Sequence, residues 1–174
     1  MATDFMREAM KRALHASRHG DVPVGAVIAK GGRIIARGEN RVQKKQDPTL
    51  HAEMIAIRSA CRKLEKKFLD GCDIYVTLEP CAMCAAAISF ARIRRLVFAA
   101  ADPKGGAVES GARLYENDGH LWKPEAARNE EYAETSARML KDFFKKLRVK
   151  KITAEPSKKD VKKRAKIIKK KGEK

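Results

Sequence analysis

The order of apolar and polar positions along the chain predicts helices that alternate with strands. Apolar side chains recur at helical spacing over residues 4–18, with Thr3 or Asp4 as the cap. Two runs rich in β-branched residues follow at 22–29 and 33–37. Because a short segment with two glycines separates these runs, they predict a β-hairpin.

The downstream pattern continues the alternation. Asp47 and Pro48 predict the start of a helix that runs to about residue 66. The elements expected after it are a strand at 73–78, an alanine-rich helix from Pro80 to about 91, a buried strand at 94–100, loops with short elements over 101–128, and a last helix from 130 to about 147 capped by Asn129. Strands that alternate with helices after an antiparallel start predict a three-layer α/β/α sandwich around a mixed central sheet.

The charge of the chain is strongly positive and unevenly distributed. Its 174 residues include 39 Lys and Arg against 22 Asp and Glu, a net charge of +17. Residues 150–174 carry +9 of this excess, and residues 1–149 carry +8. This balance indicates a polyanionic partner such as RNA, DNA or an acidic membrane surface. The length suits one domain over 1–149, followed by a lysine-rich tail.

The tail at 150–174 has too few apolar residues to fold alone. Val161, Ala165 and Ile168 fall at helical spacing, so the tail is expected to be a mobile arm that becomes helical on a partner. A passive solubilising end is the alternative.

Two features of the sequence place the protein in the cytoplasm. No stretch approaches the roughly 18 to 20 consecutive apolar residues of a membrane span, and the first residues are polar and acidic rather than secretory in pattern. The four cysteines are too few for a disulfide-dense fold. In a reducing compartment, a close pair of cysteines indicates metal or redox chemistry. No membrane partner is expected, because no stretch of the sequence is a membrane span.

A His-Ala-Glu triplet and a Pro-Cys-Ala-Met-Cys run carry the candidate chemistry. Cys81 and Cys84 lie three apart in an expected first helical turn, so both sulfurs face one way and the helix N-terminus favours thiolates. With His51 they make three ligands that Zn²⁺ accepts in tetrahedral geometry, which leaves a fourth position for water. Glu53, two residues beyond His51, is expected to reach that water as a proton shuttle.

Other cysteines and histidines leave alternatives open. A structural zinc site needs four protein ligands, and Cys61 or Cys72 is available to complete one. We interpret Cys61 as a small core residue and Cys72 as a turn residue. His15 and His19, four residues apart on the first helix, are expected to be solvated, and no partner is assigned to His120.

The combination of these two motifs resembles the signature of the zinc-dependent deaminases. The blocks similar to bacterial tRNA-specific adenosine deaminases are DVPVGAVIA at 21–29, GENR at 38–41, DPTLHAE at 47–53, YVTLEPCAMC at 75–84, ARIRRLVFAAADPKGGAVES at 91–110 and KDFFKKLR at 141–148. The resemblance implies a cytidine-deaminase-like fold, a homodimer, one Zn²⁺ per subunit, and hydrolysis of the wobble adenosine of a tRNA anticodon to inosine. The sequence departs from the family pattern at 111–128 and after Arg148.

The resemblance also implies roles for individual residues. Those implied at the metal are the ligands His51, Cys81 and Cys84, with Glu53 as general acid and base. Asn40 matches a position that binds the target nucleoside, and Val24 matches an apolar wall of its pocket. The residues implied to lie near the RNA are Asp102, Lys104, Phe143 and Phe144. Asn40 as a turn residue, and the two phenylalanines as buried aromatics that fix the last helix to the core, are the alternatives.

Two rival functions have the same metal motif. A nucleobase or nucleotide deaminase that acts on free cytosine or guanine compounds is the first, although such an enzyme has no need of +8 on its body. A non-catalytic RNA-binding module with a zinc ion is the second. Glu53 argues against it, because a structural site has no use for an unligated carboxylate there.

Overall fold

The computed structural model of the chain describes residues 3–116, 119 and 122–153. The chain divides into two compact units, Met1–Phe143 and Phe144–Lys174. Most of the predicted lysine-rich tail, and His120, lie outside the described residues. The division of the chain into 1–149 and 150–174 therefore stays a prediction. Among the described residues, every helix is too short or too polar to span a lipid bilayer.

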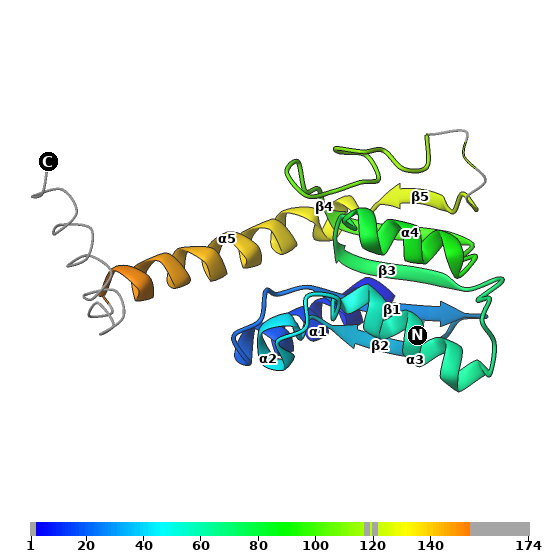
Figure 1. The fold of residues 1–174 in the computed structure, drawn as a ribbon, viewed down its shortest axis with the longest axis horizontal. Helices are drawn as coiled ribbons and strands as arrows, with labels where there is room; N and C mark the ends of the chain where they lie inside the picture. Colours follow the sequence, from blue (N-terminus) through cyan, green and yellow to red (C-terminus); the bar gives the residue numbers. More distant parts are fainter. Residues whose placement is uncertain (1–2, 117–118, 120–121, 154–174) are drawn as a thin grey trace, which may run out of the picture. The chain divides into compact units, whose positions relative to one another are not determined.

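The first unit is built on one mixed sheet (Figure 1). The elements, in chain order, are α1 (Phe5–Arg18), β1 (Gly25–Lys30), β2 (Arg33–Glu39), α2 (Val42–Lys45), α3 (Ala52–Leu64), β3 (Asp73–Leu78), α4 (Ala82–Phe90), β4 (Arg95–Ala100), β5 (Glu125–Arg128) and α5 (Glu130–Thr153). The strand order is β2-β1-β3-β4-β5. The β1 strand pairs antiparallel with β2 and β3, whereas β3, β4 and β5 run parallel.

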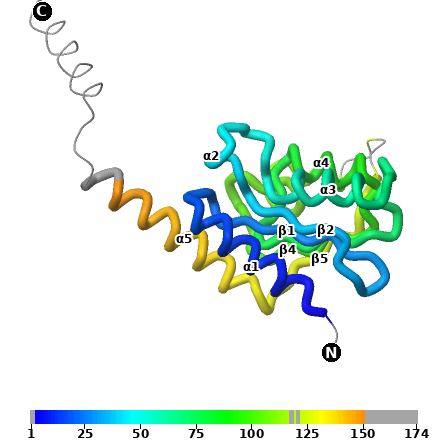
Figure 2. The backbone as a smooth tube through the Cα atoms, turned by 90° about the horizontal axis from the view of Figure 1, so that it is seen from below, coloured from blue at the N-terminus to red at the C-terminus, as the bar shows by residue number. Residues whose placement is uncertain are grey.

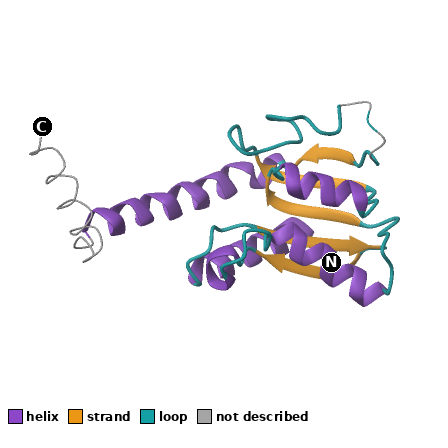
Figure 3. Cartoon of the chain, in the orientation of Figure 1, coloured by secondary structure: helices purple, strands orange, loops and turns teal. Residues whose placement is uncertain are grey.

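Helices cover both faces of this sheet, so the predicted three-layer sandwich is confirmed. Figure 2 shows α3 and α4 on one face and α1 on the other, with the strands between them, and Figure 3 distinguishes helices, strands and loops by colour. Side chains alternate accordingly along each strand. Ile28 and Phe98 pack in the core cluster beneath α3 and α4, whereas Val27 and Val97 pack against α1.

The N-terminus of α3 is held tightly against the sheet. A Cβ atom at Gly38 in β2 would collide with the carbonyl oxygen of Ala52, the first residue of α3. Ala52 and Ala56, which belong to α3, are fully buried. Small residues on both sides therefore bring the backbone of α3 close to β2, and this contact fixes the position of the His51–Glu53 segment.

Two element boundaries differ from the sequence prediction by four residues or more. The helix expected from residue 48 begins at Ala52, because the Asp47 carboxylate accepts hydrogen bonds from Thr49 N (2.8 Å) and Thr49 Oγ1 (2.7 Å) and forms a local turn. The last helix continues past 147 to Thr153. Its predicted cap is confirmed, since Asn129 Oδ1 accepts the Tyr132 N–H at 3.1 Å. The short helix α2 has no counterpart in the prediction.

Candidate metal centre and active site

Two helix N-termini bring the predicted metal ligands together. His51 is the N-cap of α3, Cys81 is the N-cap of α4, and Cys84 lies in the first turn of α4. Because α3 and α4 cover the same face of the sheet and contact each other, these positions converge. The ligand atoms of the three residues all lie within 4.8 Å of one another.

The spacing of these atoms suits a tetrahedral zinc site. His51 Nδ1 lies 3.6 Å from Cys81 Sγ and 3.5 Å from Cys84 Sγ. Zn–S bonds of about 2.3 Å and Zn–N bonds of about 2.1 Å at tetrahedral angles separate nitrogen and sulfur by about 3.6 Å. In the described part of the chain, no fourth His, Cys, Asp or Glu joins the group. Three protein ligands are typical of catalytic zinc, whereas structural sites have four.

The two remaining cysteines lie apart from this group. Cys61 is half-buried and packs against the core, as predicted. Cys72, interpreted from the sequence as a turn residue, is fully buried in the core cluster, where burial raises the pKa of its thiol. None of the four cysteines forms a disulfide. Neither Cys61 nor Cys72 lies in the group of candidate metal ligands, so neither supplies a fourth ligand.

The electrostatics of the group favour one thiolate. Hydrogen bonds from Cys84 and His51 lower the pKa of Cys81 to about 4, although burial opposes this shift. The hydrogen bond with Cys81, together with burial, raises the pKa of Cys84. The hydrogen bond to Cys81 raises the pKa of His51. A thiolate beside a thiol and an imidazole is a donor set that a borderline-soft cation stabilises by displacing protons.

Glu53 lies beside this group with part of its carboxyl group unused. The residue is in the first turn of α3 and is 3% exposed. Its Oε2 atom has no hydrogen-bond partner among the residues described. Burial raises the pKa of Glu53, because the charged carboxylate is poorly solvated there. A raised pKa together with an oxygen that has no hydrogen-bond partner suits a carboxyl group that accepts and releases a proton.

The candidate metal ligands His51 and Cys81, together with Glu53, line a cavity of about 160 Å³. Outside the His51–Glu53 segment and Cys81, its lining residues are Val22, Val24, Asn40, Leu78, Glu79 and Asp102. Pockets for drug-sized ligands measure roughly 300–1,000 Å³, so this cavity suits a single heterocyclic base. The predicted residues Asn40, Val24 and Asp102 therefore line the same cavity as the candidate metal ligands.

A buried carboxylate fixes the segment that carries Asn40. Asp21 is fully buried and accepts hydrogen bonds from Gln43 N (2.6 Å) and Lys44 N (3.3 Å), which holds the first turn of α2. Asn40 N in turn donates to Val24 O at 3.0 Å. Asn40 is 7% exposed, and its Oδ1 atom has no partner in the described structure. An unpaired buried acceptor at a cavity is suited to a ligand that donates a hydrogen bond.

The residues that the resemblance places near RNA have different surroundings. The Asp102 carboxylate accepts hydrogen bonds from Lys104 N (3.1 Å) and Gly105 N (3.0 Å), and Lys104 is exposed. Phe143 is half-buried and ends the first unit, whereas Phe144 is exposed and begins the second. Their contact with RNA stays a prediction.

The predicted histidine pair on α1 also has a protein partner. His15 Nδ1 lies 2.7 Å from the buried Glu39 carboxylate, so His15 is not simply solvated as expected. His19 is exposed, and the two Nε2 atoms are 3.4 Å apart.

Two buried carboxylates were not predicted from the sequence: Glu79, which lines the cavity, and Asp21, which holds α2. Both bind backbone N–H groups far away in the chain. The available signal was an acidic residue next to an apolar run: Asp21 directly precedes the run at 22–29, and Glu79 directly follows the run at 73–78 and precedes a proline.

Comparisons with known proteins agree with this site. Residues 1–100 match the cytidine and deoxycytidylate deaminase zinc-binding region. The chain is 49% identical over 147 residues to the tRNA-specific adenosine deaminase of Agrobacterium fabrum, covering 84% of this chain and 96% of the relative. It is 45% identical over 146 residues to that of Aquifex aeolicus, covering 83% and 94%. A solved structure from a study of A-to-I editing by tRNA:A34 deaminases at the wobble position of transfer RNA superposes with a TM-score of 0.75 at 49% identity, covering 78% of this chain and 98% of that one.

Proposed function

Because the chain belongs to the cytidine and deoxycytidylate deaminase family and, within it, to the tRNA-specific adenosine deaminases, we propose that it hydrolyses the wobble adenosine of a tRNA anticodon to inosine and ammonia. The observation that carries this proposal is a three-ligand metal group and an unpartnered buried carboxyl group at one base-sized cavity. A structural zinc site has a fourth protein ligand, and it has no use for a free carboxyl oxygen beside the metal.

The residues that hold the metal are His51, Cys81 and Cys84, with one Zn²⁺ per subunit. The distances from His51 Nδ1 to the two sulfurs support this assignment. When bound, zinc supplies a Lewis acid that lowers the pKa of a water molecule toward about 7. The chain contributes the ligands on two helix N-termini, whose partial positive charge favours the thiolate form.

Glu53 moves the protons. Its carboxyl group accepts a proton from the attacking water and delivers one to N1 of adenine, which makes C6 more electrophilic. The water oxygen first adds to C6. Glu53 then carries the remaining hydroxyl proton to the exocyclic nitrogen, the bond between C6 and this nitrogen breaks, and ammonia leaves. Adenosine and water give inosine and ammonia, so atoms balance. The raised pKa and the free Oε2 atom of Glu53 support this role.

Asn40 and Val24 position the base. The unpaired Oδ1 atom of Asn40 accepts a hydrogen bond from the target nucleoside, and Val24 packs against the base as an apolar wall. An adenosine in a duplex cannot reach this cavity, so it is turned out of its stack, at low cost in a single-stranded loop. Basic surface then holds the phosphates, and we place Asp102, Lys104, Phe143 and Phe144 near the RNA.

The lysine-rich residues 150–174 strengthen RNA binding through their net charge of +9. Removing them is expected to weaken binding of an anticodon stem-loop and to lower its salt dependence, with the rate of the chemical step unchanged. Binding measured between about 50 and 200 mM salt tests this, and an unaltered salt slope would show that the tail is passive.

The protein acts in the cytoplasm as a homodimer. The four free thiols are consistent with a reducing compartment. A groove of about 490 Å³ beside α3 offers a mixed apolar and basic surface to a second copy of the chain, and its lining residues are Leu50, Ile55, Ile57, Arg58, Cys61 and Arg62. Sedimentation analysis gives the mass of the particle, and a monomer at micromolar concentration would contradict the dimer.

Mass analysis of an anticodon stem-loop after incubation with the zinc-loaded protein tests the proposed function. The expected product has oxygen in place of one NH group at the wobble adenosine. Parallel incubations use free cytosine and free guanine. Conversion of a free base alone would identify a nucleobase deaminase, and binding of the stem-loop without any turnover would identify an RNA-binding module.

A further inference from the structure

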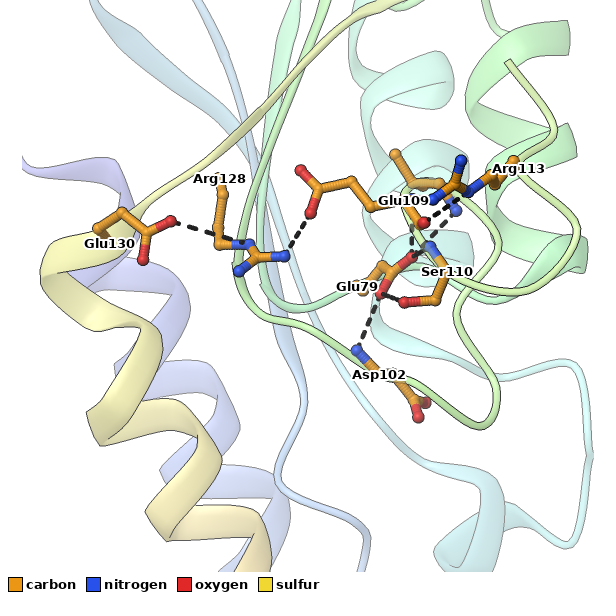
Figure 4. Close-up of polar contacts among 8 residues, drawn as sticks. Glu79, Asp102, Glu109, Ser110, Arg113, Arg128 and Glu130 are labelled. Carbon is orange, nitrogen blue, oxygen red and sulfur yellow. Dashed lines mark hydrogen bonds and ion pairs between the residues drawn. The ribbon is translucent and has the colours of Figure 1, made fainter. Parts of the chain in front are cut away.

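The carboxylate of Glu79 is buried at the cavity and surrounded by hydrogen-bond donors (Figure 4). Glu79 follows the last residue of β3 and is 2% exposed. Its Oε1 atom accepts the N–H groups of Val108 (3.1 Å), Glu109 (2.9 Å) and Ser110 (2.8 Å). Its Oε2 atom accepts Asp102 N (2.9 Å) and Ser110 Oγ (2.8 Å). Five donors from one loop therefore converge on one carboxylate.

These donors belong to an irregular segment, residues 102–110, that follows β4. A segment without helix or strand has no regular partners for its backbone N–H groups, and a buried N–H without a partner is costly. Four N–H groups that point at one oxygen pair form an anion-binding concavity. The Glu79 side chain supplies the anion, so the conformation of the loop depends on this carboxylate.

The same loop is also joined to the backbone of Pro80 and Cys81. Ala107 N donates to Pro80 O at 2.9 Å, and Gly106 forms a β-bridge with Cys81. A Cβ atom at Gly106 would lie 2.5 and 2.6 Å from the two oxygens of Glu79, so this close approach requires glycine. Glu79 thus holds the loop against the short segment that leads to a candidate zinc ligand.

The loop in turn supplies one wall of the cavity through Asp102. A single side chain therefore connects the end of β3, the segment that carries Cys81, and the wall at Asp102. We infer that Glu79 is a positioning residue that holds the 102–110 loop in place as a wall of the base-binding cavity. Its kinetic consequences rest on the proposed function, because they require that the cavity binds the target base.

Glu79 is not a second proton carrier. Both of its oxygens are engaged by loop donors. A substrate atom would have to displace one of these bonds, at the cost of an unpaired buried N–H. Glu79 therefore acts through the loop and touches neither the reacting carbon nor the departing nitrogen.

The Glu79→Gln variant tests the inference, because glutamine has the same size but turns an NH₂ group toward the loop donors. We expect the KM for the stem-loop to rise about tenfold while kcat falls by less than about threefold. A general loss of folded protein would lower the apparent kcat and leave KM unchanged, so the split separates positioning from mere instability. Zinc content is expected to be unchanged, and hydrogen exchange of the Val108–Ser110 amides is expected to accelerate.

The matched control is Glu116→Gln, which makes the same chemical change at an exposed glutamate that pairs with Arg113. It is expected to leave KM, kcat and amide exchange unchanged. Ser110→Ala, which removes one of the five donors, is the milder variant, with an expected rise in KM of about threefold. In the double variant with Glu79→Gln, the two effects are expected to be less than multiplicative, because both act through the same contact.

The outcomes separate failure of this inference from failure of the proposed function. If the unaltered protein does not deaminate the stem-loop, the proposed function is wrong, and amide exchange in Glu79→Gln still decides whether Glu79 holds the loop. If the unaltered protein is active but Glu79→Gln keeps its KM within about twofold, the positioning role is overturned. If Glu79→Gln does not fold, the KM and amide exchange of Ser110→Ala decide in the same way.

Discussion

Glu53 and Glu79 are two buried glutamates on the wall of one cavity, with opposite hydrogen-bonding environments. Glu79 accepts five hydrogen bonds, whereas Glu53 Oε2 has no partner in the described part of the chain. Burial raises the pKa of Glu53. Burial alone would also raise the pKa of Glu79, but the N–H groups of Asp102 and Ser110 hold it below its ordinary value.

This difference shows what a buried carboxyl group needs in order to do chemistry. Donors that are fixed around Glu79 stabilise its charge, so it stays ionised and organises the backbone. The Oε2 atom of Glu53 has no such donor among the residues described, and burial raises the pKa of this carboxyl group, which makes it a better proton acceptor than an exposed carboxylate. The same substitution is therefore expected to lower mainly kcat at Glu53 and mainly the free energy of unfolding at Glu79.

The largest effect is expected from Glu53→Gln, which removes the proton carrier. We expect kcat for the stem-loop to fall by about 10³-fold with zinc still bound, because an amide cannot transfer the proton. Single-turnover inosine formation and metal analysis measure the two quantities. Glu65→Gln, at the exposed C-cap of the same helix, is the control and should match the unaltered protein. Retention of more than about a tenth of kcat would remove Glu53 from the proton transfer.

For stability we expect the opposite order: the substitution at Glu79 should cost more unfolding free energy than the same substitution at Glu53. Glu79→Gln should lower the free energy of unfolding by about 3 kcal/mol, because it leaves buried N–H groups without an ionised partner. Glu53→Gln should change it by less than about 1 kcal/mol, because it removes a carboxyl group that is poorly satisfied in the fold. Urea unfolding at one fixed zinc concentration compares them. Equal losses of unfolding free energy in the two variants would show that the two carboxyl groups do not differ in their contribution to stability.

The pH dependence of stability provides a smaller effect with a defined sign. The folded-state pKa of Glu79 lies below its ordinary value of 4.5. Its contribution is therefore present above the unfolded-state pKa and is lost as the pH falls through the folded-state pKa. The difference in unfolding free energy between the unaltered protein and Glu79→Gln should narrow from about pH 6 to about pH 3. A constant difference over this range would show that the loop donors do not favour the ionised form.

The sequence predicted the parts of the fold that depend on local pattern. The strand Asp73–Leu78 appears with its predicted bounds, because its apolar run is bounded by turn residues on both sides. The start of α3 was wrong, because the Asp47 side chain caps a turn at Thr49 rather than a helix. The end of α5 was placed too early, because residues 148–153 contain neither glycine nor proline to stop a helix.

The site residues likewise differ in whether local spacing in the sequence determines their positions. His51, Glu53, Cys81 and Cys84 were predicted because short spacings at helix N-termini determine where side chains point within one turn. Glu79 was missed because its donors lie 23 to 31 residues further on, in a loop with no repeating pattern. Convergence of backbone N–H groups on a side chain is a property of tertiary structure, and no spacing in the sequence encodes it.

A third glutamate, Glu109, gives the smallest expected effect and the sharpest control on the contrast. Its side chain forms an exposed ion pair with Arg128, and its backbone N–H donates to Glu79 (Figure 4). Glu109→Gln removes only the ion pair, so Tm should change by less than about 2 °C and KM for the stem-loop should stay within about twofold. Thermal unfolding and steady-state kinetics measure both. If Glu109→Gln raised KM as much as Glu79→Gln, the exposed ion pair rather than the buried carboxylate would hold the loop. Because salt screens an exposed pair and leaves a buried one largely unaffected, repeating both measurements at about 1 M salt would identify which contact is responsible.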